Sequence, residues 1–229
     1  MQATCTSGEA EGEGMVTAQH HSSAWNIELV GPIRTTVPTK VSAAWDNGVM
    51  NAAATEGVSL RHVLVVGGTV AEWAELPADQ WADRLYEWGK VADHVSASWL
   101  TVRPFGPGHA GSQARVPARE VTVGTCVAVA QPEGDGRARL TRVIAGLQRA
   151  GEAITEASID AALNAPALVN PDLVVVVGAK HRMPPSLVWE LAYSELVFVD
   201  TTWQHFAPGH LDEAIGSYAR RHRRFGGID

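Results

Sequence analysis

The sequence predicts an α/β fold with a mostly parallel central sheet flanked by helices. Two observations support this. Valine-rich apolar runs such as His62–Gly68 and Asp172–Val177 are typical of parallel strands that are buried on both faces. Longer segments with apolar residues at helical spacing, such as Pro77–Val95, lie between these runs. Strands that alternate with helices favour parallel pairing, because each helix carries the chain back to the same end of the sheet.

The first half of this pattern contains three expected strands. The first is His62–Gly68, which ends in two glycines, and the helix Pro77–Val95 follows it. Ser98–Val102 is expected as the second strand and Glu120–Ala130 as the third. The intervening stretch Pro104–Pro117 is rich in Gly and Pro, so we expect a loop there.

The second half continues the alternation of helices and strands. Thr155 is expected to cap a helix that ends at Leu163, because its side-chain oxygen can accept a hydrogen bond from a free backbone N–H of the first turn. The expected elements are the helices Arg137–Gly151 and Thr155–Leu163, the strand Asp172–Val177, the helix Ser186–Tyr193, the strand Leu196–Val199 and the helix Leu211–Arg224.

Length and composition indicate one large domain that follows an unstructured segment. The chain has 229 residues, and residues 1–24 are rich in Gly, Ser, Ala and Glu, so we expect a disordered tail there. Residues 25–60 show only weak periodicity and stay unassigned, and residues 61–229 form the predicted domain. The net charge of −7 argues against a nucleic-acid-binding protein, because such proteins usually carry a basic face.

The sequence also predicts a cytoplasmic protein with at most peripheral membrane contact. Its first 15 residues contain no Lys or Arg, unlike a secretory signal peptide. No apolar stretch approaches the ~20 residues of a membrane-spanning helix. Cys5 and Cys126 lie far apart in different contexts, so we expect no disulfide and a reducing compartment. Cys126 sits in an apolar run and is expected in the core.

Glycines and arginines provide the candidate binding groups. Gly67-Gly68 and Gly178 each follow a predicted strand, where glycines either bring backbone N–H groups close to a phosphate or form an ordinary turn. Arg220–Arg224 is the densest positive charge in the chain. It either complements the dipole at the end of a helix or binds phosphate through guanidinium groups. The residues alone leave both pairs of alternatives open.

The C-terminal third contains a specific pattern. The stretch Trp189-Glu-Leu-Ala-Tyr-Ser-Glu-Leu-Val-Phe-Val-Asp-Thr-Thr-Trp203 resembles Trp-Gln-Leu-Ala-Tyr-Ser-Glu-Leu-Tyr-Phe-Thr-Asp-x-x-Trp of the cis-prenyltransferases, the undecaprenyl diphosphate synthase family. Leu211-Asp-Glu-Ala-Ile and Arg223-Arg-Phe-Gly-Gly227 resemble the last helix and tail of that family. The resemblance implies a dimeric parallel-sheet α/β fold with a hydrophobic tunnel. It also implies condensation of isopentenyl diphosphate with an allylic diphosphate, usually with magnesium.

The first phosphate and metal motif of the family is largely replaced. The family's His-Val-x-x-Ile-Met-Asp-Gly-Asn-Gly-Arg-Trp aligns without gaps on His62–Trp73. Gly68 falls at the position of the catalytic Asp, and Glu72 falls at that of a phosphate-binding Arg. A glycine has no side chain to hold magnesium, and a glutamate repels the diphosphate that an arginine would attract.

The second phosphate motif is only partly retained. The family's Arg-x-x-Gly-Glu-x-Arg-x-Ser-Asn aligns on Val176–Pro185, where Arg182 remains. Glu195 matches a metal-site glutamate of the family. Arg224-Phe225-Gly226 matches the Arg-x-Gly tail, which reaches a partner's active site across the dimer interface. The resemblance therefore implies substrate contacts at Arg182 and at Arg224, Phe225 and Gly226, a metal contact at Glu195, and no catalytic residue at Gly68.

This selective loss resembles the auxiliary subunits of heteromeric cis-prenyltransferases, which lack the catalytic Asp and keep the tail. We therefore expect a non-catalytic subunit that completes the active site of an active cis-prenyltransferase partner. The alternatives are an active prenyltransferase with a rebuilt diphosphate and magnesium site, working as a homodimer, and a module that binds prenyl lipids. The sequence leaves open the activity of the chain alone, the prenyl donor, the product length and the role of residues 1–60.

Overall fold

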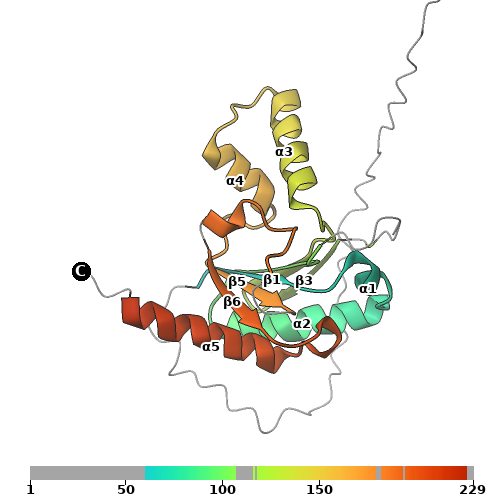
Figure 1. The fold of residues 1–229 in the computed structure, drawn as a ribbon, viewed down its shortest axis with the longest axis vertical. Coiled ribbons are helices and arrows are strands. Elements are labelled where there is room, and N and C mark those ends of the chain that lie inside the picture. The colour runs from blue at the N-terminus through green and yellow to red at the C-terminus, as the bar shows by residue number, and fades with distance from the viewer. Residues whose placement is uncertain (1–59, 107–115, 117, 179–181, 193, 226–229) are drawn as a thin grey trace, which may run out of the picture. The chain divides into compact units, whose positions relative to one another are not determined.

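A computed structural model describes residues 60–106, 116, 118–178, 182–192 and 194–225 (Figure 1). The predictions for residues 1–24 and 25–59 therefore lie outside the described residues. Within the described residues, one sheet has the strand order β3-β4-β2-β1-β5-β6. Its strands are β1 (His62–Val66), β2 (Trp99–Arg103), β3 (Arg119–Val123), β4 (Cys126–Ala130), β5 (Leu173–Val177) and β6 (Glu195–Val199).

The predicted mostly parallel sheet is confirmed. Every pair of neighbouring strands is parallel except β3 and β4, which are antiparallel. β1 and β5 are neighbouring interior strands, and all five residues of each are buried. Their apolar, valine-rich runs fit this position, because an interior parallel strand packs against apolar side chains on both faces.

Helices cover both faces of the sheet (Figure 1). On one face, α2 (Ala78–His94) packs over β2, β3 and β4, and α5 (Pro208–Phe225) packs over β5 and β6. On the other side lie α3 (Gly136–Ala150) and α4 (Glu156–Asn164), which pack against each other. The helix predicted at Pro77–Val95 is confirmed as α2, and its predicted apolar face is buried at Trp81, Leu85, Trp88 and Val91.

Capping confirms one predicted helix start and adds a short helix. Thr155 caps α4, and its hydroxyl accepts from the backbone N–H of Ser158 at 3.1 Å. The sequence did not predict α1 (Val70–Ala74), which spans only 5 residues. It begins with a capping box in which Thr69 and Glu72 satisfy each other's backbone N–H groups.

The prediction of a single strand at Glu120–Ala130 is wrong. The chain forms an antiparallel hairpin in which Val123 pairs with Cys126 across the turn Gly124-Thr125. Gly124 has φ 57°, and a glycine at this place allows a two-residue turn that matches the twist of the strands. The Asp93 carboxylate accepts from Thr125 N at 2.7 Å and from Thr125 Oγ1 at 3.0 Å, which fixes the turn on the end of α2. Cys126 is fully buried, as predicted.

The predicted amphipathic helix at Ser186–Tyr193 is also wrong. The described part of this segment is irregular apart from one 3-10 turn, η2 (Glu190–Ala192), and Tyr193 lies outside the described residues. A helix would place residues on a continuous apolar stripe. Instead, Ser186 and Glu190 are buried polar residues that hydrogen-bond to Phe105 and Arg103, and the segment follows these contacts rather than a helix.

Candidate functional site

Three glycines that follow strands meet at one edge of the sheet. Gly67 and Gly68 follow β1, and Gly178 follows β5, whose residue Val176 pairs with Val66. The chain leaves β1 toward β2 and later crosses to β5 on the other side, so the order of strands reverses here. Ligands of open α/β sheets bind beyond the carboxyl ends of strands at such a point. We call residues 67–69, 103–106, 178 and 182–186 the carboxyl edge.

Hydrogen bonds already engage two of these glycines. Gly67 N donates to Arg103 O at 3.0 Å, and Gly178 N donates to Val199 O at 3.1 Å. Phe105, just after β2, donates its N–H to Gly68 O at 2.6 Å. The Gly67 and Gly178 amides are therefore not available to a phosphate, and this favours ordinary turns at both positions.

The indole of Trp203 lies across the Gly67-Gly68 turn. Gly68 has φ 67°, and a Cβ atom added there would lie 2.7 Å from Cδ1 and Cγ of Trp203. A Cβ atom on Gly67 would lie 2.8 Å from Cε3 of the same ring. Trp203 is only 4% exposed and stacks on Trp73 with a centroid distance of 5.7 Å. The position aligned with the catalytic Asp therefore lacks a carboxylate and has no space for one.

Glu72, aligned with a phosphate-binding Arg, stabilises this turn. Its Oε2 accepts from Thr69 N at 2.6 Å, and its Oε1 accepts from Gln204 Nε2 at 2.7 Å. Burial raises the pKa of the Glu72 carboxyl, but hydrogen bonds from Thr69 and Gln204 outweigh burial and lower the pKa overall. Both oxygens are thus used to hold α1 against η3 (Trp203–His205).

Arg182, for which the resemblance implied a substrate contact, lies at the carboxyl edge. Its guanidinium carbon lies 5.3 Å from the ring centroid of Phe105, a cation–π distance. Arg182 is exposed, and Phe105 is bonded through its backbone to Gly68. Phe105 therefore links the Arg182 guanidinium to the Gly68 turn.

Glu195 lies at the opposite edge of the sheet. It begins β6 and pairs with Leu173, which pairs with Val63 at the start of β1. Gly68 follows Val63 by five residues, so it lies about 16 Å further along the strand direction, at roughly 3.3 Å per residue. Arg221 Nη1 donates to Glu195 Oε1 at 3.2 Å.

The described residues of one chain do not fit the magnesium that the resemblance implied. Among residues 60–106, 116, 118–178, 182–192 and 194–225, no group of three or more His, Cys, Asp or Glu side chains could hold a metal ion. Gly68 contributes no ligand, Glu72 is fully hydrogen-bonded, and Glu195 is distant. A single chain therefore offers no carboxylate cluster of the kind that magnesium requires.

The predicted tail lies at the limit of the described structure. The helix α5 reaches Phe225, whereas Gly226 lies outside the described residues, as do the side chains of Arg224 and Phe225. The roles predicted for these three residues therefore stay predictions.

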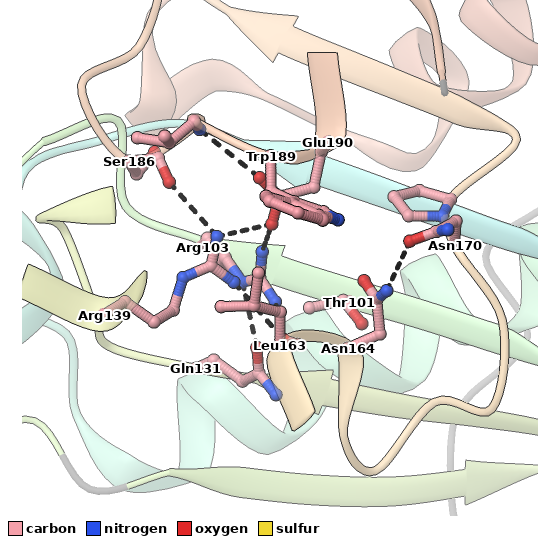
Figure 2. A network of polar contacts seen from close by, with 12 residues as sticks. Thr101, Arg103, Gln131, Arg139, Leu163, Asn164, Asn170, Ser186, Trp189 and Glu190 are labelled. Carbon is pink, nitrogen blue, oxygen red and sulfur yellow. Dashed lines mark hydrogen bonds and ion pairs between the residues drawn. The ribbon is translucent and has the colours of Figure 1, made fainter. Parts of the chain in front are cut away.

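A buried charge network behind the carboxyl edge was missed from the sequence. Figure 2 shows Arg103 at the end of β2 and Arg139 on α3 pointing toward Glu190, and both donate to its Oε1. The exposed fractions of the three side chains are 1%, 3% and 1%. Burial would raise the pKa of the Glu190 carboxyl, but the two guanidinium groups outweigh burial and hold it well below its usual range. Buried ion pairs of this kind are costly unless they are well hydrogen-bonded.

Signals for this network were present in the sequence. Glu190 stands where the quoted family pattern has Gln. Arg139 lies four residues before Val143 and eight before Leu147, so it shares the apolar face of α3. A charged residue at a core position of a helix indicates a buried partner.

A family model matches the second half of the chain. The model, described as putative undecaprenyl diphosphate synthase, matches residues 122–226. Residues 122–226 are thus similar to the cis-prenyltransferases. The matched range contains Arg182, Glu195 and the tail, whereas the Gly68 turn precedes it.

Curated relatives of this family match over part of their length. The isoprenyl transferase 2 of Bradyrhizobium diazoefficiens is 40% identical over 90 residues, which is 39% of this chain and 36% of the relative. The isoprenyl transferase of Geobacillus kaustophilus is 43% identical over 79 residues, 34% of this chain and 31% of the relative. The chain thus matches about a third of the length of these cis-prenyltransferase relatives.

Solved structures show a distant likeness. Lavandulyl diphosphate synthase from Lavandula x intermedia, in complex with dimethylallyl diphosphate, has a TM-score of 0.48 at 16% identity over 70% of this chain and 95% of that one. A probable undecaprenyl diphosphate synthase from Campylobacter jejuni has a TM-score of 0.46 at 15% identity over 75% of this chain and 98% of that one. No helix among the described residues of this chain is long and apolar enough to cross a membrane.

Proposed function

We propose that this chain is a non-catalytic cis-prenyltransferase subunit that pairs with an active member of the family. In this role the tail Arg224-Phe225-Gly226 completes the partner's active site, and the pair condenses isopentenyl diphosphate with an allylic diphosphate. The Gly68 turn supports the proposal most directly. Its left-handed φ of 67° and its contact with Trp203 leave neither a carboxylate nor space for one at the aligned position of the catalytic Asp.

The remaining polar groups fit the same proposal. Both oxygens of Glu72 hold α1 and η3 in place, and Glu195 lies at the other edge of the sheet, so neither assembles with the Gly68 turn in one chain. Magnesium would then be held by the partner's residues. An arginine in the tail suits a diphosphate, because its planar guanidinium forms paired hydrogen bonds with phosphate oxygens.

Arg182 favours a second contact with substrate. It is exposed at the carboxyl edge, above Phe105, with its charge available to a diphosphate. On this basis the chain retains diphosphate binding at its own edge without turnover. Active turnover by a rebuilt site is the competing function, and it requires a carboxylate arrangement that the described residues of one chain do not supply.

The test is a prenyl-transfer assay with magnesium, isopentenyl diphosphate and farnesyl diphosphate. It is run on this chain alone, on an active cis-prenyltransferase of the same organism alone, and on the mixture. We expect no turnover by the chain alone and stimulation in the mixture. Turnover by the chain alone would refute the non-catalytic assignment, and failure to form a complex would refute the pairing.

The tail is tested by Arg224→Ala in the mixture. Loss of one charged hydrogen-bond donor from an active site reduces turnover by about 100-fold, so stimulation should nearly vanish while the complex still elutes as one species. Arg149→Ala is the matched control, because it removes the same charge from an exposed position on α3. Equal stimulation by the Arg224 and Arg149 variants would contradict the role of the tail.

A further inference from the structure

The buried network joins five parts of the chain through two arginines and one carboxylate. Arg103 donates to Gln131 Oε1 at 2.9 Å, to Leu163 O at 3.1 Å and to Glu190 (Figure 2). Arg139 donates to Leu163 O at 3.3 Å and also reaches Glu190. β2, the residue after β4, α3, α4 and the segment 182–192 therefore meet in this network, in which Arg103 and Arg139 bind Glu190.

The network carries an excess of positive charge. Two guanidinium groups face one carboxylate, and all three side chains are almost completely buried. Burial lowers the pKa of Arg103 most, the positive charge of Arg139 lowers it further, and Glu190 opposes both effects. Removing one partner of a buried pair leaves an uncompensated charge, which destabilises the structure far more than the loss of a surface pair. Displacement of the segment that carries Glu190 would therefore leave two buried guanidinium groups without a counter-charge, which is electrostatically unfavourable.

This segment has little regular structure of its own and is held by side-chain and backbone contacts. Besides the network, Gly136 N donates to Pro185 O at 3.1 Å, Trp189 Nε1 donates to Asp160 on α4, and Leu187 is buried. The described residues of the segment contain only the 3-10 turn η2, and Met183 and Val188 on it are 46% and 38% exposed. Glu190 fixes one end, where Val188 N also donates to its Oε2 at 3.4 Å. Ser186 is a further anchor, because its hydroxyl donates to Phe105 O at 3.2 Å.

These anchors lead directly to Arg182. The Phe105 carbonyl accepts a hydrogen bond from the Ser186 hydroxyl, and the Phe105 N–H donates to Gly68 O. The Phe105 ring lies under the guanidinium of Arg182. The position of Arg182 over Phe105 therefore depends on the same segment that Glu190 holds against the two arginines.

We propose that Glu190 is a positioning residue for Arg182. Its carboxylate, held by Arg103 and Arg139, keeps residues 182–190 folded across the carboxyl edge and so presents Arg182 beside the Gly68 turn. Glu at this position, where the family pattern has Gln, supplies the counter-charge for both buried arginines, which an amide would not. The link to diphosphate binding rests on the proposed function of Arg182.

Hydrogen–deuterium exchange of the full chain tests the positioning role. Glu190→Gln should speed exchange of the Ser186–Val188 amides at least tenfold more than that of β1 and β5. Arg139→Met combined with Glu190→Gln restores the net charge of the network to that of the original protein and should recover most of the protection. Simple loss of packing predicts the reverse, because the double variant removes more contacts than the single one.

A second variant covers failure of the first to fold. Glu190→Asp keeps the charge but is shorter by one methylene, so it cannot reach both arginines and should loosen the same amides. In whichever single variant stays folded, unchanged exchange at Ser186–Val188 would overturn the proposal. Exchange that rises equally in β1 and β5 would also overturn it, as would a double variant that is worse than Glu190→Gln.

Titration with inorganic pyrophosphate connects the positioning role to binding. Arg182→Ala and Glu190→Gln should weaken binding by a similar factor of about ten, while only Glu190→Gln changes the exchange rates. Absence of pyrophosphate binding by the unmodified chain would count against the proposed function of Arg182. The exchange experiment decides the positioning role separately.

Discussion

The packing of Trp203 on the Gly68 turn can be tested directly by substitution of Gly68. Gly68→Ala adds one Cβ atom at a residue with φ 67°, at a point 2.7 Å from two atoms of the Trp203 ring. Trp203 cannot easily move away, because its ring is 4% exposed and stacks on Trp73 and Phe206. Both the backbone and the neighbouring ring therefore resist the substitution.

Two contributions set the expected size of the effect. A left-handed conformation costs an L-residue about 1–2 kcal/mol. Forcing an added carbon into a packed core costs about 1–3 kcal/mol more. The sum, about 2–5 kcal/mol, is a large part of the roughly 5–15 kcal/mol that stabilises a typical domain.

Gly151→Ala is the matched control. Gly151 also has a positive φ, 71°, but nothing lies within 4 Å of its added Cβ atom, so only the backbone contribution applies. The free energy of unfolding of each variant is measured by urea denaturation monitored by fluorescence. We expect Gly68→Ala to lose about 1–3 kcal/mol more than Gly151→Ala. Equal losses would refute the close packing of Trp203 on the turn.

The same geometry bears on any attempt to restore activity. Gly68→Asp places a larger side chain into the same contact, while Val176, Glu72 and Pro184 still differ from the family pattern. We therefore expect no turnover from this variant in the prenyl-transfer assay. Substantial turnover would show that the carboxylate was the only missing group.

Two further predictions concern titratable side chains near β1. Glu72→Arg, which introduces the residue of the family pattern, breaks the capping box with Thr69 and should lower the free energy of unfolding by about 1 kcal/mol. Glu75→Arg at the end of the same helix is the control and should be close to neutral in the same urea experiment. Burial lowers the pKa of His62 to about 4 from 6.5, so the unfolded chain takes up the proton first and stability should fall by about 3 kcal/mol between pH 6.5 and 4, and level off below. His62→Asn should remove this part of the pH dependence, and an unchanged dependence would contradict the buried neutral imidazole that hydrogen-bonds Thr101.

Local sequence signals predicted most of the fold. The interior strands could be predicted because a strand buried on both faces must be apolar throughout, as β5 is at Leu173–Val177. The errors arose where one residue changed the local geometry. At Gly124 the chain forms a hairpin where one strand was predicted. Around Glu190, which binds buried arginines, it forms an irregular segment where a helix was predicted. The first had a recognisable turn signal, whereas the second depended on arginines 87 and 51 residues away in the chain.

The sequence by itself predicted the resemblance to the cis-prenyltransferases, the mostly parallel α/β fold and most of its elements, and the absence of Asp and Arg at Gly68 and Glu72. These follow from residue types and spacing, which are local properties of the chain. Only the tertiary structure showed what the replacements do: Trp203 covers the Gly68 turn, and Glu72 holds α1 and η3 together. It also separated Glu195 from Gly68 by the length of the sheet. Distances between residues far apart in sequence depend on strand register and packing, and no local pattern specifies them.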